Sequence, residues 1–120
     1  MSKTLLVVDD NPDLRTVLEE VLENEGYTVV LAADGLEAIC KINALRPALI
    51  LLDIMMPRMD GFAFAEELER RGLRSAIPIL VLSADGRAQR AAERIGAAGY
   101  VAKPFELEQL LDQVSRLAAA

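Results

Sequence analysis

Short apolar runs alternate with amphipathic segments along the whole chain, and this alternation restricts the fold more than any other feature. The apolar runs lie at residues 5–8, 28–32, 49–52, 79–82 and 100–102. Such runs are typical of strands in a parallel sheet whose two faces are both covered by helices. We therefore expect an α/β domain.

The segments between the runs show the 3.6-residue period of helices. The first begins at Asn11, a favoured capping residue, with Pro12 at the first helical position, and Gly26 follows its end. Its apolar face consists of Leu14, Val17, Leu18, Val21 and Leu22. Further helices are expected near residues 36–42, 62–68, 86–95 and 107–117.

Two of these helices carry specific expectations. The second has its apolar residues at Leu36, Ile39, Cys40 and Ile42, so Cys40 is expected to be a small core residue. Segment 86–95 is rich in Ala, and Ile95 is its only large apolar residue. Because a helix that buries little is held weakly, we expect this one to be among the least stable elements.

Five strands that alternate with five helices predict a doubly wound, flavodoxin-like parallel sheet with strand order 2-1-3-4-5. The length of 120 residues suits a single domain that covers residues 1–120. In a sheet of this kind the carboxyl ends of all strands share one edge, and ligands bind there.

Polar residues stand where four of the apolar runs stop. Asp9 and Asp10 follow the first run, Asp53 the third and Ser83 the fourth, and Lys103 follows the fifth. We expect these side chains to converge on one pocket. Three carboxylates that lie together repel one another and need a cation or a raised pKa. Their hard oxygen atoms make Mg²⁺, or alternatively Mn²⁺, the natural ion.

Composition narrows the chemistry further. The chain has no His, which excludes His-based catalysis and His metal sites, and its single Cys excludes an internal disulfide and suits a reducing cytosol. The net charge of −6 argues against nucleic-acid binding by this chain. No apolar run reaches the roughly 18 residues of a membrane span, and none resembles a signal peptide. We therefore expect a cytoplasmic protein without membrane contact.

A lysine beside a bound cation is consistent with a multiply charged anion in the same pocket. A phosphoryl group fits, with the metal on one oxygen, Lys103 on a second and the Ser83 hydroxyl on a third. Without His or a reactive Cys motif, the nucleophile is expected to be a carboxylate, which would form an aspartyl-phosphate.

Four motifs carry a resemblance to a known family. They are the segments VVDDN at 7–11, LDIMMPRMDG at 52–61, LSA at 82–84 and GYVAKPF at 99–105. In this order and at these strand ends, the chain resembles the receiver (phosphoacceptor) domains of bacterial two-component response regulators over essentially all its length. The resemblance implies that Asp53 is the phosphoacceptor and that Lys103 pairs with the phosphate. It also implies that Mg²⁺ is held by Asp9, Asp10, Asp53 and the backbone carbonyl of Met55.

The resemblance further implies a switch. Ser83 would be the switch hydroxyl and Tyr100 the switch aromatic, and the output face would comprise the fourth helix, fifth strand and fifth helix. The bond from Lys103 to Pro104 is expected to be cis. Met55 and Asp85, which flank the expected site, are expected to tune the phosphate lifetime.

The implied function is a phosphorylation-activated signalling switch. A sensor histidine kinase or a His phosphotransfer protein would supply the phosphoryl group, and the output would be a protein target or an effector domain outside this chain. The chain would be a monomer or a weak, phosphorylation-dependent dimer. It would catalyse only its own phosphoryl transfer and dephosphorylation, and so would not be an enzyme in the ordinary sense.

Two alternatives remain open from the sequence. One is a phosphorylation-independent interaction module on the same fold. The other is an Asp-nucleophile phosphohydrolase of the haloacid-dehalogenase type. That enzyme needs a second Asp two residues after the nucleophile, where this chain has Met55, and it needs a cap segment that the sequence does not contain.

Overall fold

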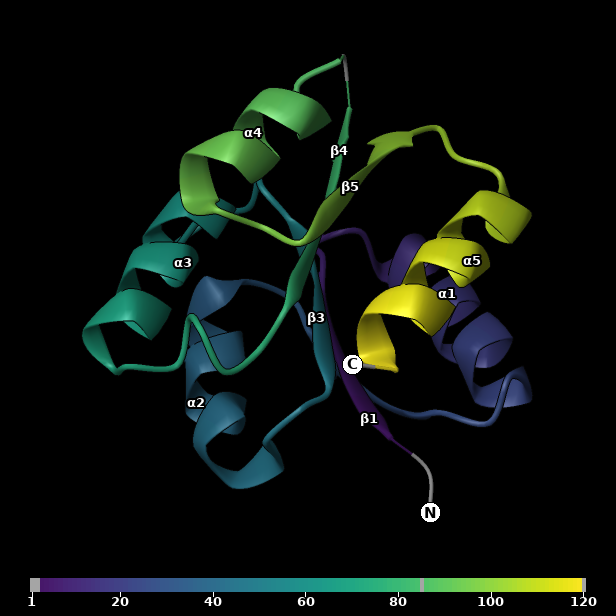
Figure 1. The fold of residues 1–120 in the computed structure, drawn as a ribbon, viewed down its shortest axis with the longest axis horizontal. Coiled ribbons are helices and arrows are strands. Elements are labelled where there is room, and N and C mark those ends of the chain that lie inside the picture. Colours follow the sequence, from purple (N-terminus) through teal and green to yellow (C-terminus); the bar gives the residue numbers. More distant parts are fainter. Residues whose placement is uncertain (1–2, 85, 120) are drawn as a thin grey trace.

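The computed structural model describes residues 3–84 and 86–119, and it is a five-stranded parallel sheet between two layers of helices (Figure 1). The strand order is β2-β1-β3-β4-β5, which confirms the predicted topology. The strands are β1 (Thr4–Val8), β2 (Thr28–Ala32), β3 (Leu49–Asp53), β4 (Ile79–Ala84) and β5 (Gly99–Lys103). The helices are α1 (Pro12–Asn24), α2 (Gly35–Leu45), α3 (Gly61–Arg70), α4 (Ala88–Ile95) and α5 (Leu107–Ala118).

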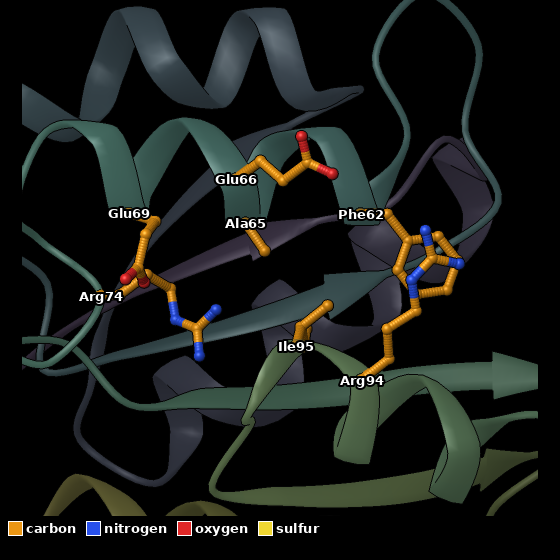
Figure 2. Close-up of a pocket in the computed structure, with 7 residues that line it drawn as sticks. All are labelled: Phe62, Ala65, Glu66, Glu69, Arg74, Arg94 and Ile95. Atoms are coloured by element: carbon orange, nitrogen blue, oxygen red, sulfur yellow. The ribbon is translucent and has the colours of Figure 1, made fainter.

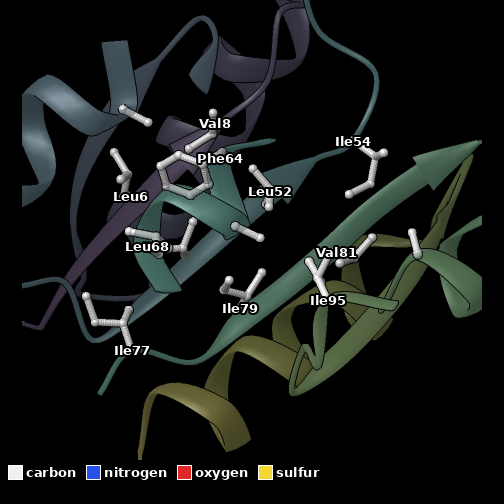
Figure 3. Close-up of a cluster of buried hydrophobic side chains, with 14 of the residues drawn as sticks. Leu6, Val8, Leu52, Ile54, Phe64, Leu68, Ile77, Ile79, Val81 and Ile95 are labelled. Atoms are coloured by element: carbon white, nitrogen blue, oxygen red, sulfur yellow. The ribbon is translucent and has the colours of Figure 1, made fainter. Parts of the chain in front are cut away.

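The sheet has a hydrophobic core on each face because its strands send alternate side chains to opposite sides. Leu6 and Val8 of β1 face α2, α3 and α4, where they join the cluster around Phe64 that Figure 3 shows. Leu5 and Val7 of the same strand face α1 and α5 on the other side. This double coverage explains the continuous apolar runs of the three central strands, β1, β3 and β4.

The predicted start of α1 is confirmed, and α3 also begins at a side-chain cap. The Asn11 side chain accepts hydrogen bonds from the N–H groups of Asp13 and Leu14, at 3.0 and 3.3 Å, with Pro12 at the first helical position. Asp60 caps α3 by accepting from the N–H of Ala63 at 2.9 Å. These caps fix where the helices leave the carboxyl edge of the sheet.

Helix α4 starts two residues later than expected and has no side-chain cap. It packs on β4 and β5 through Ala88, Ala91, Ala92 and Ile95. Small buried residues bring the helix close to the sheet, but they remove little apolar surface from water. Asp85, which precedes this helix, lies outside the described residues.

The expectation for Cys40 is wrong, because Cys40 is exposed on α2. The helix buries Ala38 and Ile42 instead. Successive residues turn by about 100° around a helix, so Leu36 and Cys40, each two positions before a buried residue, point away from the core. Among the described residues, no helix has the length and apolar character needed to cross a membrane.

Candidate functional site

Three carboxylates meet at the carboxyl edge of the sheet. Val8 and Leu52 are register partners in β1 and β3, so the next residues of the two strands, Asp9 and Asp53, emerge side by side. Asp10 lies beside them, and one carboxylate oxygen from each of the three acids lies within 4.8 Å of the others. Asp9 and Asp53 are buried, whereas Asp10 is exposed.

Lys103 reaches the same place from the end of β5. Its Nζ lies 2.8 Å from Oδ2 of Asp9 and 3.7 Å from Oδ1 of Asp53. Strand β4 lies between β3 and β5, so the lysine stem must extend past the end of β4 to reach these acids. The peptide bond from Lys103 to Pro104 is cis, as expected.

Asp9 is held on every side. Its Oδ1 accepts a hydrogen bond from the backbone N–H of Asn11 at 2.9 Å. Its backbone carbonyl accepts from Nη1 of Arg15 at 2.6 Å. Sequence reasoning did not single out Arg15, although its place in the first turns of α1, beside an acidic strand end, is a usable signal. The first bond orients the buried Asp9 carboxylate, and the second holds its backbone in place.

Asp53 has the most perturbed acid–base chemistry of the site. Burial, and after it the charge of the neighbouring Asp9 carboxylate, raises the pKa of Asp53 to about 6. Lys103 and the N–H of Met55, which lies 3.4 Å from Oδ1 of Asp53, act in the opposite direction. A cation placed among the three acids would remove the repulsion that contributes to this rise.

Ser83 and Tyr100 are not brought together in this structure. Ser83 is buried near the end of β4, and it lines a hollow of about 340 Å³ together with Ile54, Met55 and residues of α3 and α4. Within residues 3–84 and 86–119, its hydroxyl makes one long hydrogen bond, donating to the carbonyl of Ala84 at 3.5 Å. Tyr100 on β5 is 41% exposed and lines a different hollow along α4.

A further hollow between α3 and α4 is separate from the site (Figure 2). The guanidinium of Arg94 lies 3.9 Å from the centre of the Phe62 ring at one end of it, and Glu69 and Arg74 lie toward the other end. It contains none of the polar residues that the sequence places at the strand ends. The acidic pocket is therefore the candidate site.

The donor set of this pocket suits a hard divalent cation. Three carboxylates supply oxygen ligands, and one exposed side leaves room for water, as Mg²⁺ and Mn²⁺ require. Together with the lysine, the pocket can hold a cation and an anion side by side. Fold and site define a doubly wound α/β domain with an acidic pocket, suited to a cation, at the carboxyl edge of its sheet.

This chain belongs to the response regulator receiver domain family, whose profile matches residues 5–115. Response regulator MprA of Mycobacterium tuberculosis is 44% identical over 119 residues, which are 98% of this chain and 51% of MprA. The DNA-binding dual master transcriptional regulator RpaA of Synechocystis is 36% identical, over 94% of this chain and 48% of RpaA. The receiver domain of Francisella response regulator 1452 has a TM-score of 0.88 at 28% identity, over 98% of each chain.

Two conclusions follow from these comparisons. The chain is a response regulator receiver domain of two-component systems, a class of signalling domain and not of classical enzymes. It spans about half the length of the curated relatives that it matches.

Proposed function

We propose that residues 1–120 form one receiver domain that is switched by phosphorylation of Asp53. The observation that carries the proposal is the position of this carboxylate. Asp53 ends β3 at the rim of the pocket, with the acids Asp9 and Asp10 within 4.8 Å and the ammonium of Lys103 at 3.7 Å. A nucleophilic oxygen, a cation site and a fixed positive charge are the parts that phosphoryl transfer needs.

Asp9, Asp10, Asp53 and the backbone carbonyl of Met55 would hold Mg²⁺, or Mn²⁺ in its place. When bound, the cation would neutralise charge on the phosphoryl oxygens. Burial is the main reason that the pKa of Asp53 is raised, and repulsion from the other carboxylates, which a cation would relieve, adds to it.

The chain's own residues account for the transfer step. An oxygen of Asp53 forms the new bond to phosphorus, while the P–N bond to the donor imidazole breaks and the imidazole leaves with that electron pair. Lys103 pairs with one phosphoryl oxygen, and the Ser83 hydroxyl donates to another. The chain has no His, so the phospho-His belongs to a sensor histidine kinase or a His phosphotransfer protein in the cytoplasm. Slow hydrolysis of the aspartyl-phosphate resets the domain.

Phosphorylation would change the α4–β5–α5 face. Ser83 would move toward the phosphoryl group, and Tyr100 would turn from its exposed position into the space that this opens. Helix α4 can respond because its buried residues are mostly alanines and it has no side-chain cap. The partner that binds this face is a separate protein target or an effector domain outside this chain, as in relatives that are transcriptional regulators. The domain works as a monomer or as a weak dimer that forms on phosphorylation.

Beryllofluoride with Mg²⁺, which stands in for the phosphoryl group, tests the switch. Amide exchange over residues 86–103 should change in the wild type and stay unchanged in Asp53→Asn. Unchanged protection in both proteins would instead favour an interaction module that works without phosphorylation. A phosphohydrolase is disfavoured by Met55, which stands where that enzyme class has its acid.

A further inference from the structure

We propose that Arg58 and Asp34 form a latch that positions the β3–α3 loop, residues 54–60, and through it the cation site. The inference rests on the proposed function, because the loop contains Met55, whose backbone carbonyl is a proposed ligand of the cation. Neither latch residue supplies a ligand to the acidic pocket, so both act as positioning residues.

Asp34 is the fixed half of the latch. It is only 3% exposed and precedes α2, where its Oδ1 accepts a hydrogen bond from the N–H of Glu37 at 2.9 Å. Its Oδ2 accepts from Nε of Arg58 at 2.7 Å and lies 2.5 Å from Nη2 of the same guanidinium. A carboxylate that caps a helix and holds an arginine fork has little freedom to move.

The backbone conformation of the loop brings Arg58 to Asp34. Arg58 has a φ of 64°, a left-handed conformation that residues other than glycine rarely adopt. The N–H of Gly35 donates to the carbonyl of Met59 at 3.1 Å, next to the ion pair. A Cβ atom at Gly35 would lie 2.6 Å from Cγ of Met59, so the loop seats directly on the start of α2.

The other end of the loop is also fixed. The N–H of Gly61 donates to the carbonyl of Ile54 at 2.8 Å and closes the loop on itself. Met55 lies between the two fixed points, where its N–H contacts Asp53 and its carbonyl is the proposed fourth ligand. Loss of the contact between Arg58 and Asp34 would therefore allow the Met55 carbonyl to move, although neither residue belongs to the acidic pocket.

The direction in which Mg²⁺ affinity changes when Arg58 is replaced distinguishes a positioning role from a purely electrostatic one. Removing a positive charge near an acidic pocket should strengthen cation binding if charge alone matters. If Arg58 positions the loop, its loss should weaken binding, because groups that orient metal ligands typically contribute severalfold or more to affinity.

The test measures the Mg²⁺ dissociation constant by calorimetry, without phosphodonor, for Arg58→Gln, Arg58→Gly, Asp34→Asn and the Asp34→Asn/Arg58→Gln double variant. Arg58→Gly removes the guanidinium and relieves the left-handed backbone, so this variant should stay folded. We expect each single variant to bind Mg²⁺ about threefold or more weakly, and the double variant to bind no more weakly than Arg58→Gln. Arg70→Gln is the control, because it removes an exposed arginine from a surface pair on α3, 77% exposed against 62% for Arg58, and should leave affinity unchanged.

Equal or tighter Mg²⁺ binding in both Arg58 variants would overturn the latch. A second readout keeps the inference separate from the proposed function. Amide exchange at Met59 and Gly61 in metal-free protein should accelerate in Arg58→Gly and not in Arg70→Gln. If the wild type binds no Mg²⁺, the proposed function fails, and the exchange rates alone then decide whether the latch holds the loop.

Discussion

The ammonium of Lys103 lies 2.8 Å from Oδ2 of Asp9, closer than it lies to Asp53, the proposed phosphoacceptor. Asp9 is completely buried, so its charge needs a partner, and Lys103 supplies one from the far side of β4. In this structure the lysine acts as a counter-ion for the acidic pocket. A divalent cation and the lysine therefore compete for the same carboxylate.

This competition predicts opposite effects of one substitution. Lys103→Gln should bind Mg²⁺ more tightly, because a repelling charge is gone, yet accept a phosphoryl group from acetyl phosphate at least tenfold more slowly. Calorimetry and the rate of aspartyl-phosphate formation measure the two effects. Lys41→Gln, which removes a partly exposed lysine on α2, is the control. Weaker Mg²⁺ binding by Lys103→Gln would show that the lysine organises the cation site instead.

The raised pKa of Asp53 predicts a pH dependence of stability in metal-free protein. Between its ordinary value of 3.8 and about 6, the folded state keeps a proton that the unfolded state has lost. This residue therefore makes the free energy of unfolding decrease as pH rises through that range, and the loss is complete above it. Asp53→Asn should remove this decrease and be more stable at pH 7.5 by roughly 1–2 kcal/mol.

Urea denaturation at several pH values, with a chelator present, measures the difference between the two proteins. Asp112→Asn, an exposed acid on α5, is the matched control and should follow the wild type. A wild type as stable as Asp53→Asn at pH 7.5 would contradict a buried, repelled carboxylate at position 53.

Bound Mg²⁺ should offset the destabilisation that the buried, ionised Asp53 causes at neutral pH. At a free concentration ten times its dissociation constant, a ligand that binds only the folded protein adds about 1.4 kcal/mol to stability. Thermal unfolding should show this gain in the wild type, its loss on adding a chelator, and little or no gain in Asp9→Asn. A gain of equal size in Asp9→Asn would place the cation elsewhere.

Gly61 allows α3 to begin in close contact with the backbone of Asp53 and Ile54, next to the acidic pocket. A Cβ atom there would lie 2.8 Å from Cα of Ile54 and 2.9 Å from the carbonyl oxygen of Asp53, both of them backbone atoms. Gly61→Ala should therefore cost about 2 kcal/mol or more in the free energy of unfolding. In the control Gly99→Ala, the nearest atom is the end of the flexible Gln113 side chain at 3.1 Å, so the cost should be clearly smaller.

The sequence was sufficient for the features that depend on local chemistry. Apolar runs predicted the strands and their order, and Asn11 and Pro12 predicted the start of α1. The convergence of Asp9, Asp53 and Lys103 followed from the parallel sheet alone, because parallel strands end at one edge. Their roles in phosphoryl transfer remain predictions.

Two kinds of feature could not be predicted from the sequence. They are the side of a short helix that faces the sheet and the pairing of residues far apart in the chain. Cys40 was assigned to the core because an apolar pattern alone does not fix which side of a short helix faces the sheet. The pairing of Arg58 with Asp34 joins residues 24 positions apart through a left-handed backbone that no sequence signal announces. The choice of Asp9 as the nearer partner of Lys103, at 2.8 Å against 3.7 Å for Asp53, depends on side-chain positions that the sequence does not specify.

The central claim, that Asp53 accepts a phosphoryl group, is tested most directly by intact mass. Wild type and Asp53→Asn are incubated with acetyl phosphate, each with Mg²⁺ and with a chelator. The account predicts one adduct of about 80 Da on the wild type with Mg²⁺, and no adduct with chelator or on Asp53→Asn. An unmodified wild type, or an equal adduct on Asp53→Asn, would contradict it.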